Sequence, residues 1–228
     1  MDILSGRAGV EDAALFYEEA GRGFPIVFIH GAGADSTLWD DQFTIFAREF
    51  RVVRYDLRGY GRSFSEPGTF SHMDDLQALL QARGIEQAFL VGWGTGTQLA
   101  IDFALAQPQQ AAGLVLVNPS VRLPATAPLG LIPNSGAPGD EESHSEPANT
   151  RSLSQLRVPS IVITGEDTAP DALRSARLLH ATIPDAMKAN LNGAGQMPNH
   201  ERPIQFNRIL LTFFDWVKSR VEGSDLLR

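Results

Sequence analysis

Short apolar segments alternate with amphipathic ones along most of the chain, and this alternation restricts the fold more than any other feature. Five apolar segments have the length and content of buried strands: Ile26–His30, Arg51–Tyr55, Ala88–Val91, Gly113–Val117 and Ile161–Thr164. Strands that alternate with helices form a mainly parallel sheet, with helices on both faces. The sequence therefore predicts the α/β class.

The remaining elements follow from the same patterns. Two shorter strands are expected at Leu15–Glu18 and Met187–Leu191. Ser36 and Ser71 are suitable helix N-caps, and the helix after Ser36 is expected to end near Arg48. Further helices are expected from the glycines after Trp93 to about Gln107, at Asp171–Ile183 and at Pro203–Val221. Ligands of such sheets bind beyond the carboxyl ends of the strands, so a site is expected there.

Length and composition indicate one soluble domain spanning residues 1–228. Hydrophobic residues make up 43% of the chain and charged residues 20%, which excludes disorder as a description of the whole chain. The net charge of −8 argues against nucleic acid as a partner. The absence of cysteine excludes disulfides and thiol nucleophiles, and fits a reducing compartment. No segment has the character of a signal peptide or a membrane span, so we expect a cytoplasmic protein without membrane contact.

The segment 120–157 interrupts the alternation of strands and helices. It is rich in proline and glycine, includes the acidic stretch Asp140-Glu141-Glu142 and lacks a periodic apolar face. We interpret it as an irregular linker.

A strand, a tight turn and a helix are expected in succession at Phe89–Gly96. This is the context of the nucleophile elbow, G-x-S-x-G, in which the central residue adopts a strained conformation. Here the central residue is Gly94, which takes up a positive φ without strain. The sequence thus predicts the shape of the elbow without its nucleophile.

The chain resembles the α/β-hydrolases, in particular the small enol-lactonases (3-oxoadipate enol-lactonase) and esterases. The resemblance extends over Leu15–Val121 and Val158–Val217. It is carried by the elbow and by the segments 30–34 with Trp39, 55–63, 165–168 and 195–203, in this order and spacing. It implies an α/β-hydrolase fold in which the linker at 120–157 replaces the helical cap.

The resemblance also implies that no member of the catalytic triad is intact. The nucleophile of the family falls on Gly94, its acid on Thr168 and its histidine on Gln196. Because none of these side chains can perform the step its counterpart performs, the relay of a serine hydrolase is lost. The preferred interpretation is a degenerate hydrolase, retained as a binding or regulatory module.

An oxyanion hole needs only backbone N–H groups, which are expected from Ala32 and Thr95. At Thr95 the N–H, rather than the side chain, is expected to face the site. Gly31, Trp93 and Trp39 are the other expected pocket residues, although each Trp is more simply a packing aromatic. The pocket favours a small carboxylate or carbonyl compound as its ligand.

Several alternatives stay open. An unorthodox lactonase or esterase would use Asp167 or His200 as its base, although the simpler reading of each is a surface residue. The glycines after two strands are also broken forms of the dinucleotide fingerprint, with Asp56 as the ribose-binding acid. Loss of the cap would leave an apolar patch for self-association. No histidine spacing supports a metal site, and no cofactor is expected.

Overall fold

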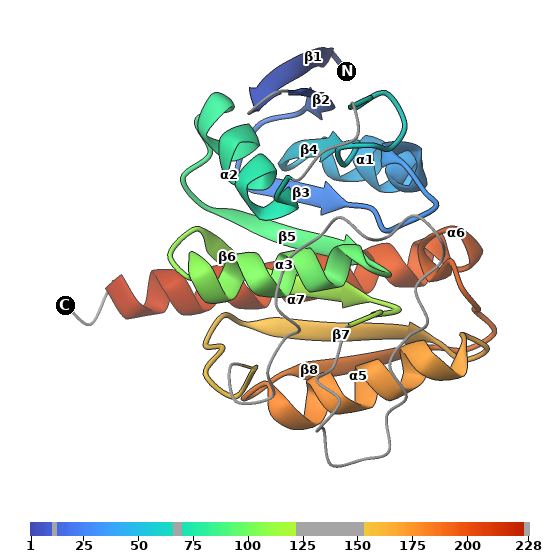
Figure 1. Ribbon diagram of the computed structural model, residues 1–228. Helices are drawn as coiled ribbons and strands as arrows, with labels where there is room; N and C mark the ends of the chain where they lie inside the picture. The colour runs from blue at the N-terminus through green and yellow to red at the C-terminus, as the bar shows by residue number, and fades with distance from the viewer. Residues whose placement is uncertain (11–12, 66–69, 122–152, 226–228) are drawn as a thin grey trace.

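Eight strands form one sheet in a computed structural model that describes residues 1–10, 13–65, 70–121 and 153–225 (Figure 1). The strand order is β1-β2-β4-β3-β5-β6-β7-β8. Only β2 runs against the other strands, since it pairs antiparallel with both β1 and β4. The strands are β1 (Ile3–Val10), β2 (Ala13–Ala20), β3 (Pro25–Ile29), β4 (Arg51–Tyr55), β5 (Ala88–Trp93), β6 (Ala111–Val117), β7 (Ser160–Gly165) and β8 (Met187–Leu191).

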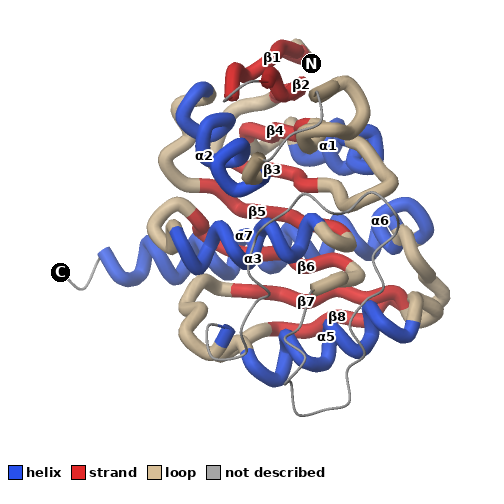
Figure 2. Tube along the Cα trace, viewed as in Figure 1, coloured by secondary structure: helices blue, strands red, loops and turns tan. Residues whose placement is uncertain are grey.

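Helices cover both faces of the sheet, as Figures 1 and 2 show. Alternate side chains of the central strands point to opposite faces, so Val27 packs with one set of helices and Phe28 with the other. The first set is α2 (His72–Ala82), α3 (Gly96–Ala106) and α5 (Pro170–Thr182), and the second is α1 (Asp40–Phe46) and α7 (Pro203–Asp225). A short 3₁₀ helix, η1 (Ser36–Trp39), precedes α1, and a short helix, α6 (Pro198–Glu201), precedes α7.

The predicted α/β-hydrolase fold, with its mostly parallel sheet and two helical layers, is confirmed. Two details differ from the prediction. Strand β1 was not expected, because its residues show little apolar alternation and most of its side chains are exposed. Ser36 was expected to cap a helix, but it lies buried inside η1, where Asp35 is the N-cap and accepts the Thr37 N–H. The cap at Ser71 is confirmed, since its hydroxyl accepts the Asp74 N–H at 3.2 Å.

Most of the expected linker, residues 122–152, lies outside the described residues. Its described ends pack into the core, where Val121, Leu153 and Leu156 are buried. No helix within the described ranges is both long and apolar enough to cross a membrane.

Candidate functional site

The turn between β5 and α3 has the geometry of a nucleophile elbow. Gly94 has a φ of +58°, and its N–H donates to the carbonyl oxygen of Val117 at 3.0 Å. Its own carbonyl oxygen accepts from the Thr97 hydroxyl at 2.6 Å and from the Ser120 N–H at 3.0 Å. With a further bond from the Thr97 N–H at 3.3 Å, four hydrogen bonds to its backbone fix this residue between β6 and α3.

Glycines allow the elbow to lie directly against the neighbouring backbone. A Cβ atom added at Gly96 would lie 2.4 Å from the carbonyl oxygen of His30, so only glycine fits there. A Cβ atom added at Gly94 would have no atom within 4 Å, although Gly94 is buried. The elbow therefore has open space where a nucleophile's side chain would begin.

The two other positions predicted to correspond to the triad are in direct contact. The Thr168 hydroxyl donates to the side-chain oxygen of Gln196 at 3.0 Å. Thr168 follows β7 and is 6% exposed, whereas Gln196 lies in the loop between β8 and α6. Residues 28 positions apart thus form a hydroxyl–amide pair at the carboxyl edge of the sheet.

The backbone of Gln196 is held on the elbow side by two further side chains. Its carbonyl oxygen accepts from the indole N–H of Trp93 at 3.0 Å and from the Asn118 side-chain nitrogen at 2.8 Å. Asn118 also donates to the carbonyl oxygen of Gly195 at 3.0 Å, and its side-chain oxygen accepts the Gly165 N–H at 3.1 Å. With a φ of +41°, buried Asn118 joins β6, β7 and this loop. Its position directly after the predicted strand Gly113–Val117 places it among the strand ends where a site was expected, although no role was predicted for its side chain.

Glu201 holds the same loop from the solvent side. One carboxylate oxygen accepts the Gly195 N–H at 2.5 Å, and the other accepts the Met197 N–H at 2.8 Å. These two backbone hydrogen bonds lower the pKa of Glu201 below its usual value. Glu201 is therefore an anion at neutral pH, directly beside the loop.

The turn after β3 meets the elbow through Ala32. Its backbone N–H donates to the Thr95 hydroxyl oxygen at 2.7 Å. The side chain of Thr95 thus contacts this turn, a contact that was not predicted. His30 has a structural role in the same turn, because its Nε2 accepts the Leu57 N–H at 2.9 Å and its Nδ1 lies 2.9 Å from the carbonyl oxygen of Gly31. Burial lowers the pKa of His30, which keeps the ring neutral.

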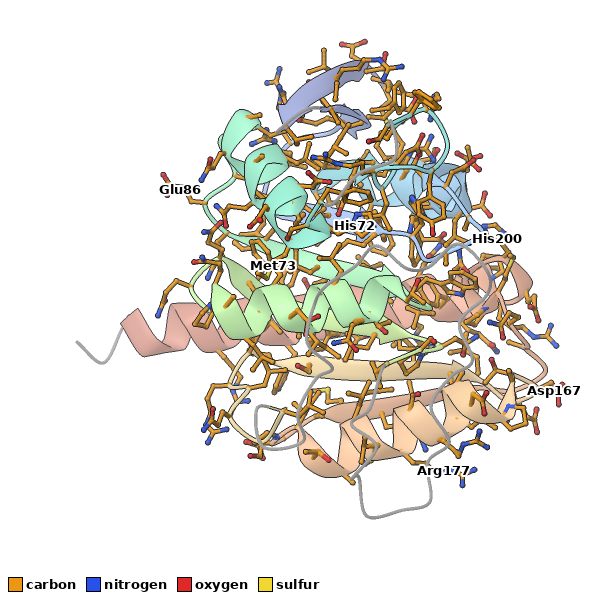
Figure 3. The ribbon with its side chains drawn as sticks, viewed as in Figure 1. His72, Met73, Glu86, Asp167, Arg177 and His200 are labelled. Carbon is orange, nitrogen blue, oxygen red and sulfur yellow. The ribbon has the colours of Figure 1, made fainter. Side chains whose placement is uncertain are left out.

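Within the described residues, no hydrogen bond joins the side chains of the remaining candidates to the Thr168–Gln196 pair, although the Asp167 N–H donates to the carbonyl oxygen of Ala194 at 2.9 Å. The His200 ring nitrogen Nε2 lies 2.6 Å from the carbonyl oxygen of Leu38 and is engaged there. Asp167 is exposed and lies at the outer margin of the molecule in Figure 3, away from His200. Trp39 has no exposed surface and packs against Phe28, with ring centroids 4.9 Å apart.

Asp56 is not free to bind a ribose, as the dinucleotide alternative required. It is 1% exposed, and its carboxylate accepts the Ser36 N–H at 2.8 Å and the Arg62 N–H at 2.7 Å. Burial raises the pKa of Asp56, but these hydrogen bonds outweigh that effect and keep it lowered. Among the described residues, no three His, Asp or Glu side chains gather to hold a metal ion.

Comparisons with known proteins bear on the family and the fold of the chain. A model of the Alpha/beta hydrolase family matches residues 26–148. A putative carbamate hydrolase, RutD, of Azorhizobium caulinodans is 27% identical over 252 aligned positions, which cover 89% of this chain and 95% of the relative. A pimeloyl-[acyl-carrier protein] methyl ester esterase of Aliivibrio salmonicida is 31% identical over 112 positions, or 49% of this chain and 42% of the relative.

Solved structures share the fold across nearly the whole chain. An esterase of Thermogutta terrifontis superposes with a TM-score of 0.77 at 22% identity, covering 95% of this chain and 99% of that one. A meta-cleavage product hydrolase of Pseudomonas fluorescens gives 0.78 at 19% identity, covering 92% and 97%. With the family match spanning more than half of the sequence, the chain belongs to the alpha/beta hydrolase family.

Proposed function

We propose that this protein is a degenerate hydrolase that binds a small carbonyl or carboxylate compound at the elbow without cleaving it. The observation that carries the proposal is the hydrogen bond from the Thr168 hydroxyl to the Gln196 side-chain oxygen. It corresponds in position to the acid–histidine contact of a triad, yet neither group takes up or releases a proton near neutral pH. Beside it, Gly94 offers no nucleophile.

The positioning of the site supports retention for binding. Trp93, Asn118 and Glu201 all hold the loop that presents Gln196, through hydrogen bonds of 2.5 to 3.0 Å. The open space beside Gly94 leaves room for a ligand atom where a serine side chain would lie. In this proposal, replacement of the cap by the segment 120–157 removes the lid that excludes water from the site of a working hydrolase.

The first test is hydrolysis of p-nitrophenyl acetate at high protein concentration. The wild type is compared with the triple variant Gly94→Ser, Thr168→Asp, Gln196→His. We expect the wild type to show at most the residual rate that remains after loss of a triad, on the order of 10³-fold over water. The triple variant is expected to exceed it, since the elbow accepts a Cβ at residue 94 and the contact between residues 168 and 196 already exists.

Two further variants separate binding from unorthodox catalysis. Asp167→Asn and His200→Asn each remove one candidate base, and we expect neither to change the wild-type rate. Repeated turnover by the wild type that is abolished by either substitution would refute the proposal in favour of an esterase or lactonase. A thermal-shift screen with small carboxylates, esters and lactones tests binding directly, and a screen without any stabilised sample would also refute it.

A further inference from the structure

The hydroxyl of Thr95 occupies a backbone N–H group that the elbow would otherwise offer to a ligand. The Ala32 N–H donates to Thr95 Oγ1 at 2.7 Å, a short bond for an N–H donor. Ala32 and Thr95 are the residues whose N–H groups were expected to form the oxyanion hole. A ligand oxygen therefore does not find the Ala32 N–H free.

Packing of the turn against the elbow keeps this hydrogen bond in place. A Cβ atom added at Gly31 would lie 2.7 Å from the carbonyl oxygen of Trp93, 2.9 Å from the Thr95 nitrogen and 3.1 Å from Thr95 Oγ1. The two backbones are thus in direct contact through Gly31 on one side and Gly96 on the other. Both segments directly follow buried strands, β3 and β5, which position the Ala32–Thr95 bond.

We infer that the Thr95 hydroxyl is the ligand-contacting donor of this site, in place of the Ala32 N–H. A hydroxyl that accepts one hydrogen bond still has its own proton to donate. Thr95 is exposed, and it directly follows Gly94, beside which there is open space. The accepted bond from Ala32 also polarises the hydroxyl and strengthens it as a donor.

The chemistry that this donor recognises is an sp² oxygen. Esters, lactones and carboxylates all present one. At the start of α3, the N–H groups of Thr97 and Gln98 already donate to the carbonyl oxygens of Gly94 and Thr95, so they do not compete with the hydroxyl for this oxygen. This inference rests on the proposed binding function of the same site, and Thr95 becomes the residue that determines how tightly the oxygen is held.

The test compares ligand affinity among four proteins: the wild type, Thr95→Val, Thr95→Ser and Thr212→Val. The probes are γ-butyrolactone for a neutral carbonyl and acetate for a carboxylate, titrated separately at constant ionic strength and followed by amide NMR shifts. Valine keeps the shape of threonine but removes the hydroxyl, whereas serine keeps the hydroxyl. Thr212 is an exposed residue of α7 whose hydroxyl donates to the Arg208 carbonyl, so it controls for the substitution itself.

We expect Thr95→Val to weaken binding of at least one probe by about 2- to 13-fold, the equivalent of one hydrogen bond. Thr95→Ser and Thr212→Val should both stay within about twofold of the wild type. The probe that responds identifies the source of the oxygen. If thermal unfolding shows that Thr95→Val is not folded, Thr95→Ala takes its place with the same expected loss.

The opposite outcomes distinguish failure of this inference from failure of the proposed binding function. Equal or tighter binding by Thr95→Val would overturn the inference, because the hydroxyl would then be neutral or an obstacle, while the proposed binding function would stand. Equal loss in Thr95→Val and Thr95→Ser would overturn it as well, since shape rather than the hydroxyl would matter. Absence of binding of both probes to the wild type would overturn the inference together with a carbonyl- or carboxylate-binding function.

Discussion

Asn118 is the side chain on which the arrangement of the site depends most, and its removal gives a quantitative prediction. In Asn118→Ala, the buried Gly165 N–H loses its acceptor and the carbonyl oxygens of Gly195 and Gln196 lose a donor. An orphaned buried donor costs about 1 to 3 kcal/mol, and each further hydrogen bond contributes about 1 kcal/mol. Gln196 keeps its bond from Trp93, which limits the loss at that oxygen.

We therefore expect Asn118→Ala to lower the free energy of unfolding by about 3 kcal/mol. In a chain of this length, this corresponds to a fall in Tm of about 6 to 12 °C. The backbone adds to the cost, because φ at residue 118 is +41° and asparagine tolerates the left-handed region better than alanine. The measurement is urea unfolding at pH 7, followed by tryptophan fluorescence and circular dichroism.

The matched control is Asn190→Ala. Asn190 is an exposed residue of β8 that accepts one hydrogen bond, from the Thr164 hydroxyl at 3.1 Å. The buried Thr164 hydroxyl loses its acceptor in this control, so we expect a loss of about 1 kcal/mol, against about 3 kcal/mol for Asn118→Ala. If Asn118→Ala loses no more than this control, the reasoning that one side chain joins β6, β7 and the Gln196 loop is refuted.

Three other predictions concern single residues of the described fold. Gly94→Ala should lower the free energy of unfolding by about 1 to 2 kcal/mol, because of the positive φ alone. Gly96→Ala should lower it clearly more, because its Cβ would overlap a carbonyl oxygen. Equal urea midpoints for the two variants would contradict this. Glu201 has a lowered pKa, so its contribution to stability is present above the unfolded value of about 4.5 and is lost as the pH falls through the folded value. Unfolding between pH 3 and 7 should therefore depend less on pH in Glu201→Gln, and an unchanged profile would show that its two hydrogen bonds contribute nothing. Burial, with charge repulsion from His30 and Arg58, lowers the pKa of His72 to about 4. Stability that is present above pH 6.5 should therefore fall by about 2 kcal/mol on acidification to pH 4.5. That fall should disappear in His72→Leu, and its persistence in this variant would assign it to other groups.

The central sheet could be predicted because its strands carry their own signal. Helices cover both faces of the sheet, so the side chains of its central strands, such as Val27 and Leu116, are buried. Continuous apolar segments therefore identify the parallel strands. Strand β1 gave no such signal, because it lies at the edge of the sheet and its residues Ile3 and Leu4 are half exposed. Its place depends on pairing with β2, which is not a local property of its sequence.

The candidate site could be predicted only in part. The turn at Gly94 was expected from the sequence, and the resemblance to the family pointed to residues 168 and 196, but the contact between them was not predicted. The side chains that cross between elements could not be found in this way, because their partners are distant in sequence. Thr95 reaches Ala32 across 63 positions, and Asn118 reaches Gln196 across 78.

In the proposed function, these cross-links allow three positions to differ from a catalytic triad while the arrangement around them is kept. The groups that hold the site are backbone atoms of the elbow and three side chains, Trp93, Asn118 and Glu201. None of these hydrogen bonds involves a side chain at residue 94, so a glycine there leaves every one of them intact. The pair at residues 168 and 196 supplies one donor and one acceptor, as an acid and a histidine do. In the proposed function, geometry and reactivity are therefore determined by different residues, so that reactivity is lost while the geometry serves binding.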